Sequence, residues 1–97
     1  MTGTATLVQL TKGGFLLAVD PPFPRRWSGG QQVVNQHGEG LVATHLAVDM
    51  GTGAVTVYLA EATGYLVDYT PLASLQGDDL AQALVDWLAS EGYSYQG

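Results

Sequence analysis

Apolar and polar residues alternate along two short segments near the N-terminus, residues 4–10 and 15–20. Alternation with a period of two is typical of β-strands that bury one face. The segments are joined through Lys12, Gly13 and Gly14, and we expect the two glycines to supply the positive φ angles of a tight turn. The pattern therefore predicts an N-terminal β-hairpin.

Residues 21–40 break this alternation. Pro21, Pro22 and Pro24 remove backbone donors and favour the polyproline II conformation, so we expect the second strand to stop at Asp20. A polar, glycine-punctuated stretch follows, in which residues 31–35 are compatible with a short strand. We interpret residues 21–40 as one long irregular loop, and loops of this length are usually functional or mobile.

Alternation returns in three segments, residues 41–49, 54–61 and 64–70, which are separated by short turns. Short connections of this kind join antiparallel neighbours, and Pro71 is placed to end the last segment. The pattern predicts a three-stranded antiparallel meander.

The period of the apolar residues then changes from the two of a strand to that of a helix. Leu80, Ala83, Leu84, Trp87 and Leu88 recur on one side of a helix predicted over residues 78–91. Asp78 is the expected N-cap, and Gly92 is placed to close the C-terminus. Residues 93–95 are compatible with either a short added strand or a loose end.

These elements predict a single α+β domain over residues 1–97. It comprises an N-terminal β-hairpin, a long Pro/Gly-rich loop, a three-stranded antiparallel meander, and one C-terminal amphipathic helix packed on the sheet.

The meander has two faces of different character when Asp49 is placed opposite Ala54 and Glu61 opposite Gly64. An aliphatic face, which we expect to receive the helix, carries Val42, Thr44, Leu46, Val48, Val55, Val57, Leu59 and Leu66. The second face carries Ala43, His45, Ala47, Thr56, Tyr58, Ala60, Tyr65, Val67 and Tyr69.

The second face lacks the charged residues expected on the solvated side of an antiparallel sheet. It carries small residues and three tyrosines, with His45 expected opposite Tyr58. Tyrosine is favoured at interfaces because it offers a large apolar area and a polar tip. Two interpretations stay open: His45, Tyr58, Tyr65 and Tyr69 bind a partner protein, or the N-terminal hairpin covers this face.

The net charge of the chain limits the classes of partner that it is expected to bind. The net charge is −6, and Lys12, Arg25 and Arg26 are the only lysines and arginines. Nucleic-acid binding and attachment to an anionic membrane both need a basic surface, so neither is expected. Charged residues form 12% of the chain, which is about half the globular average, and interface cores are likewise depleted in charge.

The sequence has no signal-peptide pattern and no apolar run of about 18 residues, as a transmembrane helix requires. We expect a soluble protein that is cytoplasmic or virion-associated. The chain has no cysteine, which excludes disulfides and thiolate chemistry.

No catalytic or metal-binding pattern is predicted. His37, Glu39 and His45 share sequence parity, but a fourth ligand is not evident and a solvated loop is the simpler interpretation. The serines lie outside any nucleophile motif, and the beginning of the helix explains the adjacent acids Asp78 and Asp79. We expect a protein that is not an enzyme and has no cofactor.

The segment from Pro21 to Trp27 is the second candidate partner site. It matches a Pro-x-x-Pro-x-Arg ligand of SH3 domains. Phe23, Arg25, Arg26 and Trp27 are aromatic and arginine residues of the kind that dominate interface hot spots. The alternative is that Phe23 and Trp27 plug one end of the core.

Together, these observations predict a non-catalytic protein–protein interaction protein that binds a protein partner or forms a homo-oligomer. The preferred form is a small structural subunit of a larger assembly, such as a virus particle or another multimer. A small acidic inhibitor or adaptor that blocks a larger protein is the alternative, and a small-molecule binding module is the third.

Overall fold

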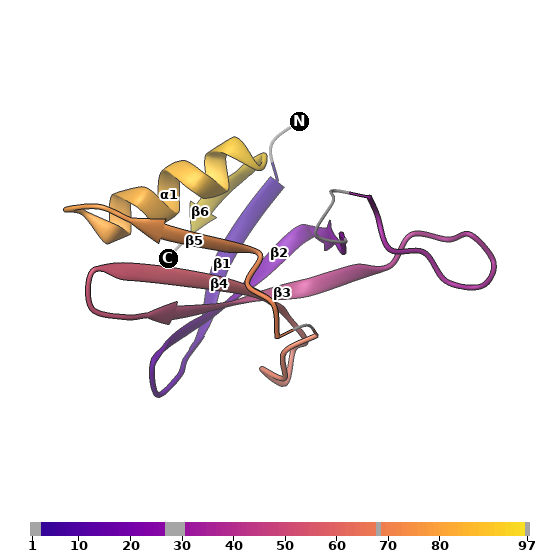
Figure 1. Ribbon diagram of the computed structural model, residues 1–97, viewed down its shortest axis with the longest axis horizontal. Coiled ribbons are helices and arrows are strands. Elements are labelled where there is room, and N and C mark those ends of the chain that lie inside the picture. The colour runs from indigo at the N-terminus through magenta and orange to yellow at the C-terminus, as the bar shows by residue number, and fades with distance from the viewer. Residues whose placement is uncertain (1–2, 27–30, 68, 97) are drawn as a thin grey trace.

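The fold is α+β, as the sequence predicts, and the computed structural model describes residues 3–26, 31–67 and 69–96. One curled six-stranded sheet carries a single helix on one face (Figure 1). The elements are β1 (Gly3–Leu10), β2 (Gly14–Pro24), β3 (Val42–Met50), β4 (Ala54–Ala60), β5 (Ala73–Gln76), α1 (Leu80–Ser90) and β6 (Tyr93–Gln96).

The strand order across the sheet is β5-β4-β3-β2-β1-β6. All neighbours are antiparallel except β1 and β6, which run parallel. The connection from β5 through α1 to β6 therefore crosses from one edge of the sheet to the other, over the face on which the helix packs (Figure 1).

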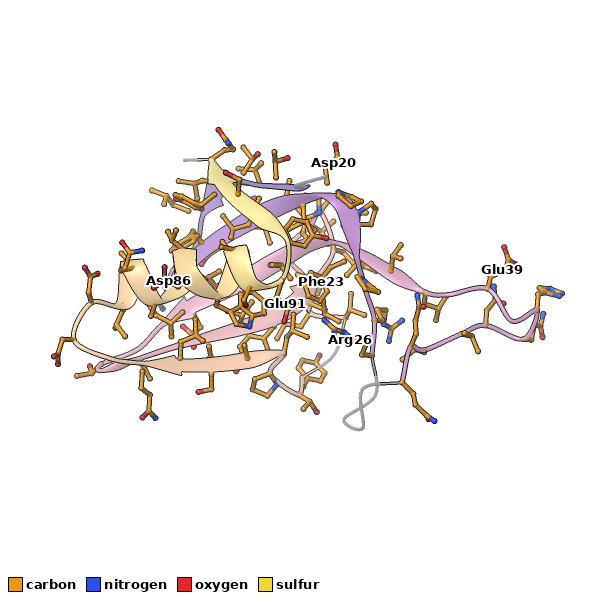
Figure 2. All side chains as sticks on the ribbon, turned by 90° about the horizontal axis from the view of Figure 1, so that it is seen from above. Asp20, Phe23, Arg26, Glu39, Asp86 and Glu91 are labelled. Carbon is orange, nitrogen blue, oxygen red and sulfur yellow. The ribbon has the colours of Figure 1, made fainter. Side chains whose placement is uncertain are left out.

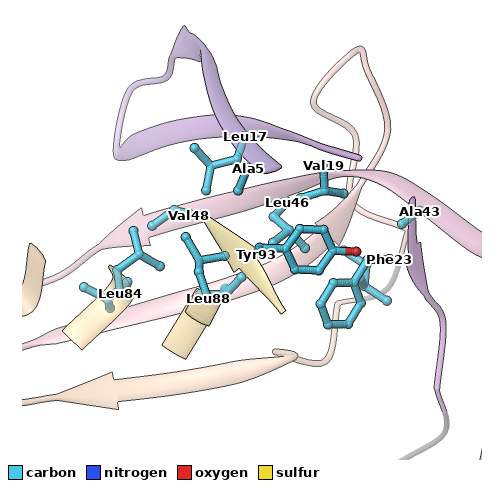
Figure 3. Close-up of a cluster of buried hydrophobic side chains, with 13 residues drawn as sticks. Ala5, Leu17, Val19, Phe23, Ala43, Leu46, Val48, Leu84, Leu88 and Tyr93 are labelled. Carbon is cyan, nitrogen blue, oxygen red and sulfur yellow. The ribbon is translucent and has the colours of Figure 1, made fainter. Parts of the chain in front are cut away.

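The core lies between this face and α1. Leu84 and Leu88 of the helix pack against strand residues that include Leu17, Leu46 and Val48 (Figure 3). The sequence prediction of an aliphatic face turned toward the helix is confirmed for Leu46, Val48, Val55, Val57 and Leu59, all of which are buried.

The register between β3 and β4 differs from the predicted one. Val48 lies opposite Val57 and Met50 opposite Val55, two residues away from the expected pairing. A shift of two residues preserves the face on which each side chain lies, whereas a shift of one would reverse it. The faces of these two strands were therefore predicted correctly in spite of the register.

The predicted three-stranded antiparallel meander is present as β3, β4 and β5, but the residues assigned to its third strand were wrong. Residues 64–67 form no strand, and only one isolated bridge joins Leu66 to Ala60. The edge of β4 is instead occupied by β5, which brings Leu75 opposite Val55. Leu66 shares the face of Ala60 and stays outside the core, while its neighbour Val67 packs against the core.

The predicted end of the second strand at Asp20 is also wrong, because β2 continues through Pro24. The pairing of β2 with β3 shifts between Ala18 and Phe23, where the prolines supply no ladder donors. Beyond this irregularity, Phe23 lies opposite Ala43 and both are buried. Ala43 and Leu46 thus both face the core although two residues separate them.

The alternation of buried and exposed residues also fails near the beginning of β3, because the pairing of β3 with β2 is irregular there. Val42 is 49% exposed and Thr44 is exposed, so neither belongs to the core face as predicted. Ala43, predicted on the opposite face, replaces them. The cause is the interrupted ladder with β2, in which the four residues 19–22 of β2 lie against the single residue Thr44 of β3.

Residues 31–41 form a projecting arm. Its two sides are held by hydrogen bonds from the N–H of Leu41 to the carbonyl of Val33 and from the N–H of Asn35 to the carbonyl of Glu39. The predicted strand over residues 31–35 is reduced to isolated bridges. The arm extends away from the sheet, with Glu39 near its end (Figures 1 and 2), and the longest dimension of the molecule is 43 Å.

The N-cap of the helix lies one residue later in the chain than predicted. Asp79, not Asp78, is the N-cap, and its Oδ1 accepts a 3.1 Å hydrogen bond from the N–H of Gln82. Gly92 follows the helix with φ of 91°, as predicted for a closing glycine. This helix has eleven residues, and the described part of the chain contains no helix able to cross a membrane.

The N-terminal hairpin is confirmed, but its glycines act differently from the prediction. Neither Gly13 nor Gly14 has a positive φ. A Cβ atom at Gly14 would instead collide with the backbone carbonyl of Val48 on β3. Gly14 therefore permits a close approach of two strands.

Candidate interaction surface

The sheet face opposite the helix, here named the outer face, is built from two cross-strand rows. Leu16, Ala47 and Tyr58 form one row, and Ala18, His45 and Ala60 form the other. Leu16 and Ala60 are buried without belonging to the main core, and Ala18, His45, Ala47 and Tyr58 are half-buried.

The hairpin of β1 and β2 does not lie over this face as a second layer. It continues the curled sheet instead, because β2 pairs directly with β3. The loop between β4 and β5 provides partial cover instead. Its residues Thr63, Gly64 and Tyr65 line an open depression of about 280 Å³ together with Gln9, Thr11 and Leu16.

The four residues predicted for the Tyr-rich partner site separate into two pairs. His45 and Tyr58 lie half-buried on the outer face. Tyr65 and Tyr69 lie on the β4–β5 loop and are 76% and 84% exposed. His45 lies opposite Ala60 rather than opposite Tyr58 as predicted, and its Nδ1 is 2.8 Å from the hydroxyl oxygen of Thr44.

The residues predicted for the second partner site, in the segment from Pro21 to Trp27, also lie in different surroundings. Phe23 is 1% exposed and stacks with both Trp87 and Tyr93, whose ring centroids are 6.2 and 5.7 Å away. Phe23 thus plugs the end of the core, which is the alternative that the sequence left open. Arg25 is half-buried at the base of the arm, and Trp27 lies outside the described residues.

Arg26 is held by the same cluster. Its guanidinium lies 5.2 Å from the centre of the Phe23 ring and 3.3 Å from a carboxylate oxygen of Glu91 (Figure 2). Cation–π contact and ion pairing both fix the guanidinium against the protein's own surface. Arg26 therefore serves to connect β2 to the end of the helix.

Tyr93 completes this cluster from β6. Its hydroxyl donates a 2.6 Å hydrogen bond to the carbonyl of Pro21. Burial raises the pKa of the Tyr93 hydroxyl above its ordinary value, and the nearby carboxylates of Glu91 and Asp20 add to the increase. The phenol stays neutral at physiological pH and acts as a structural donor.

The most exposed large apolar side chains lie mainly on three projecting segments. Val8 and Leu10, 51% and 76% exposed, lie near the tip of the β1–β2 hairpin. Val34, 52% exposed, lies on the arm, and the two exposed tyrosines lie on the β4–β5 loop. The sequence pattern did not reveal the exposure of Val8, Leu10 and Val34, because alternation assigns a side chain to a face but does not show where along a strand the core ends.

Within the described ranges, no three His, Asp or Glu side chains come together as metal ligands would. His37 and Glu39 lie in the turn of the arm, where their N–H groups donate to the Asn35 side-chain oxygen at 2.8 and 3.1 Å. His45 lies on β3, in the sheet. The three residues that share sequence parity therefore belong to different structural units.

Comparison with known proteins gives no guide to function. No protein-family model, no curated protein and no solved structure matches this chain.

Proposed function

We propose that this protein is a non-catalytic protein–protein interaction protein, a small structural subunit of a larger assembly such as a virus particle or another multimer. One observation carries the proposal: exposed large apolar side chains gather on segments that project from the body. These are Leu10 on the hairpin, Val34 on the arm, and Tyr65 and Tyr69 on the β4–β5 loop.

Physical chemistry supports this assignment. Covering an exposed leucine or valine side chain completely is worth about 1.5–3 kcal/mol. The projecting segments cannot be covered by the chain's own core, which lies between the sheet and α1. A partner protein that packs against them supplies the missing cover.

We propose further that the protein acts as a soluble component in the cytoplasm or within a virion. Its acidic, low-charge composition suits contact with proteins rather than with nucleic acid or anionic lipid.

The experiment compares the complexes formed by the native chain with those formed by a variant in which exposed apolar residues of the projecting segments are replaced. The chain is tagged and purified from its natural source, and the masses of its complexes are measured by light scattering. A triple variant, Leu10→Ser with Val34→Ser and Tyr69→Ser, is expected to leave the complexes and elute as a folded monomer. Val85→Ser is the matched control, because Val85 is 37% exposed on the helix and away from the projections.

Two results would contradict the proposal. One is a native chain that is monomeric in its natural source and under every purification condition. The other is a triple variant that remains in the same complexes with unchanged mass. A complex of one chain with one larger target, dependent on the same residues, would replace the structural subunit by the inhibitor or adaptor.

A further inference from the structure

The depression on the outer face, here named the hollow, lies between two segments that are far apart in the sequence. The β1–β2 hairpin contributes Gln9, Thr11 and Leu16, and the β4–β5 loop contributes Thr63, Gly64 and Tyr65. Figure 1 shows both segments extending to the side of the sheet that faces away from α1. The tertiary structure therefore brings together six residues that belong to no common sequence motif.

Backbone hydrogen bonds order both sides of the hollow. On the loop, the N–H of Glu61 donates to the carbonyl of Tyr65 at 2.9 Å, and the N–H of Gly64 donates to the carbonyl of Glu61 at 2.8 Å. Gly64 has φ of 90°, which favours glycine at this position. On the hairpin, the N–H of Thr11 donates to the carbonyl of Gly14 at 3.0 Å. The hollow is therefore formed before a ligand binds, as binding sites usually are.

The polar groups that line the hollow are neutral, and no charged side chain of the described residues lines it. They are the amide of Gln9 and the hydroxyls of Thr11 and Thr63, and each of these groups can both donate and accept. Gln9 and Thr11 make no side-chain hydrogen bond with the described residues, and the Thr63 hydroxyl accepts one long bond of 3.5 Å from the N–H of Tyr65. All three side chains can therefore bond to a ligand while the contacts within the protein remain.

The apolar surface that the hollow offers lies mainly on one aromatic ring. Leu16, at its floor, is 1% exposed and presents little area to a ligand, whereas Tyr65 is 76% exposed. A tyrosine ring has a flat apolar face. The ligand that suits this lining has hydroxyl groups around its rim and one apolar face made of C–H groups.

We propose that the hollow binds one neutral sugar ring, a pyranose. The C–H face of the sugar packs against the ring of Tyr65. Its hydroxyl groups bond to the side chains of Gln9, Thr11 and Thr63. The volume of about 280 Å³ lies just below the range of about 300–1,000 Å³ for sites of drug-sized ligands, and this suits a single ring.

Other classes of small molecule fit the lining less well. A charged ligand would be desolvated without gaining an ion pair, and a wholly apolar ligand would cover the amide and hydroxyl groups without bonding to them. A nucleoside is neutral and can stack on tyrosine, so it is the rival that the experiment must include.

The affinity is expected to be low because the hollow is open and covers only part of a sugar. We expect a dissociation constant of about 1–10 mM. Repetition of the site over many copies in an assembly raises the overall affinity without any new contact. Only this last step rests on the proposed function.

Two-dimensional NMR of the isotope-labelled full chain tests the inference. The chain is titrated with glucose, galactose, mannose and N-acetylglucosamine up to about 100 mM, roughly ten times the weakest expected dissociation constant. Saturable shifts at the backbone amides of the hollow are expected with at least one sugar. Glycerol, the control for hydroxyl-rich solvent, is expected to give no saturation. Methyl glycosides, whose reducing hydroxyl is blocked, distinguish the end of a glycan chain from a free sugar.

Two variants locate the ligand within the hollow. Tyr65→Ala is expected to weaken binding at least about tenfold, because it removes the apolar face. Its matched control is Tyr69→Ala, since Tyr69 is 84% exposed on the same loop and does not line the hollow.

Thr11→Val keeps the shape of the side chain and removes its hydroxyl, so binding is expected to weaken about two- to tenfold. Thr4→Val is the control, because Thr4 is exposed near the beginning of β1, outside the hollow. Thermal unfolding of each variant establishes that the domain remains folded.

Three results would overturn the inference. They are the absence of saturable shifts with every sugar, equal binding by the native chain and Tyr65→Ala, and tighter binding of cytidine than of any sugar. None of them affects the proposed function, whose test replaces Leu10, Val34 and Tyr69, and these three residues do not line the hollow. A monomeric chain that binds a sugar would remove the proposed function and leave this inference standing.

Discussion

Phe23 links three parts of the molecule that are distant in sequence. It belongs to β2, stacks on Trp87 of α1 and Tyr93 of β6, and lies beneath the guanidinium of Arg26. Offset aromatic contacts of this kind add roughly 0.5–1.5 kcal/mol beyond area burial. One of the four residues that the sequence offered as a partner site in the proline-rich segment is thus used inside the domain.

Tyr93→Phe tests the polar edge of this cluster. At neutral pH the variant loses the hydrogen bond to the Pro21 carbonyl, and we expect it to be about 0.5–1.5 kcal/mol less stable. Because the folded state raises the pKa of Tyr93, the unfolded chain releases this proton first. The native contribution is complete below about pH 10 and is lost as pH rises through the folded pKa.

Urea unfolding at about pH 7.5 and about pH 10.5, on either side of the ordinary tyrosine pKa, measures this effect. Tyr69→Phe is the control because Tyr69 is 84% exposed. The stability difference between wild type and Tyr93→Phe is expected to shrink at the higher pH. An unchanged difference would mean that Tyr93 titrates alike in the folded and unfolded states.

The helix illustrates how an element depends on its terminal residues. Asp79 caps the first turn through Gln82, whereas its neighbour Asp78 makes no such bond among the described contacts. Both aspartates lie close to the positive end of the helix dipole. Comparing them separates the hydrogen bond from the charge.

Asp79→Ala is expected to lower the free energy of unfolding by about 1 kcal/mol, the usual cost of removing an N-cap. Asp78→Ala removes the same charge and is expected to cost only a few tenths of a kcal/mol. Chemical denaturation monitored by circular dichroism measures both. Equal losses in the two variants would show that charge alone stabilises the helix.

At the scale of the whole molecule, the core and the projections are separate. No residue of the arm, residues 31–41, belongs to the core cluster. The arm and the body are joined at the base, where the N–H of Arg25 donates to the carbonyl of Leu41. The domain is therefore expected to fold without the end of the arm.

Replacing residues 34–40 by Asn-Gly tests this separation, because a two-residue turn suits the hydrogen-bonded pair of Val33 and Leu41. We expect the free energy of unfolding to change by less than about 1 kcal/mol, as is usual for changes away from the core. Leu46→Ala is the contrasting variant, with an expected loss of about 2–5 kcal/mol. Thermal and urea unfolding would reveal a larger loss in the shortened chain, which would give the arm a structural role.

The sequence by itself determined the fold class, the hairpin, the helix and the aliphatic face formed by Leu46, Val48, Val55, Val57 and Leu59. These features follow from periodicity, which is a local property: a period of two or of about 3.6 assigns a side chain to a face whatever the strand pairs with. A two-residue register error left those faces unchanged.

Only the tertiary structure decided which strand lies beside which and what remains exposed. β5, rather than the predicted strand over residues 64–70, pairs with the edge of β4. The proline-containing end of β2 belongs to the sheet, and its Phe23 lies in the core. Both outcomes depend on competition between distant segments for one edge and one core, and local pattern carries no information about that competition. The exposure of Leu10 and Val34 has the same origin, because the extent of the core is set by where the helix packs.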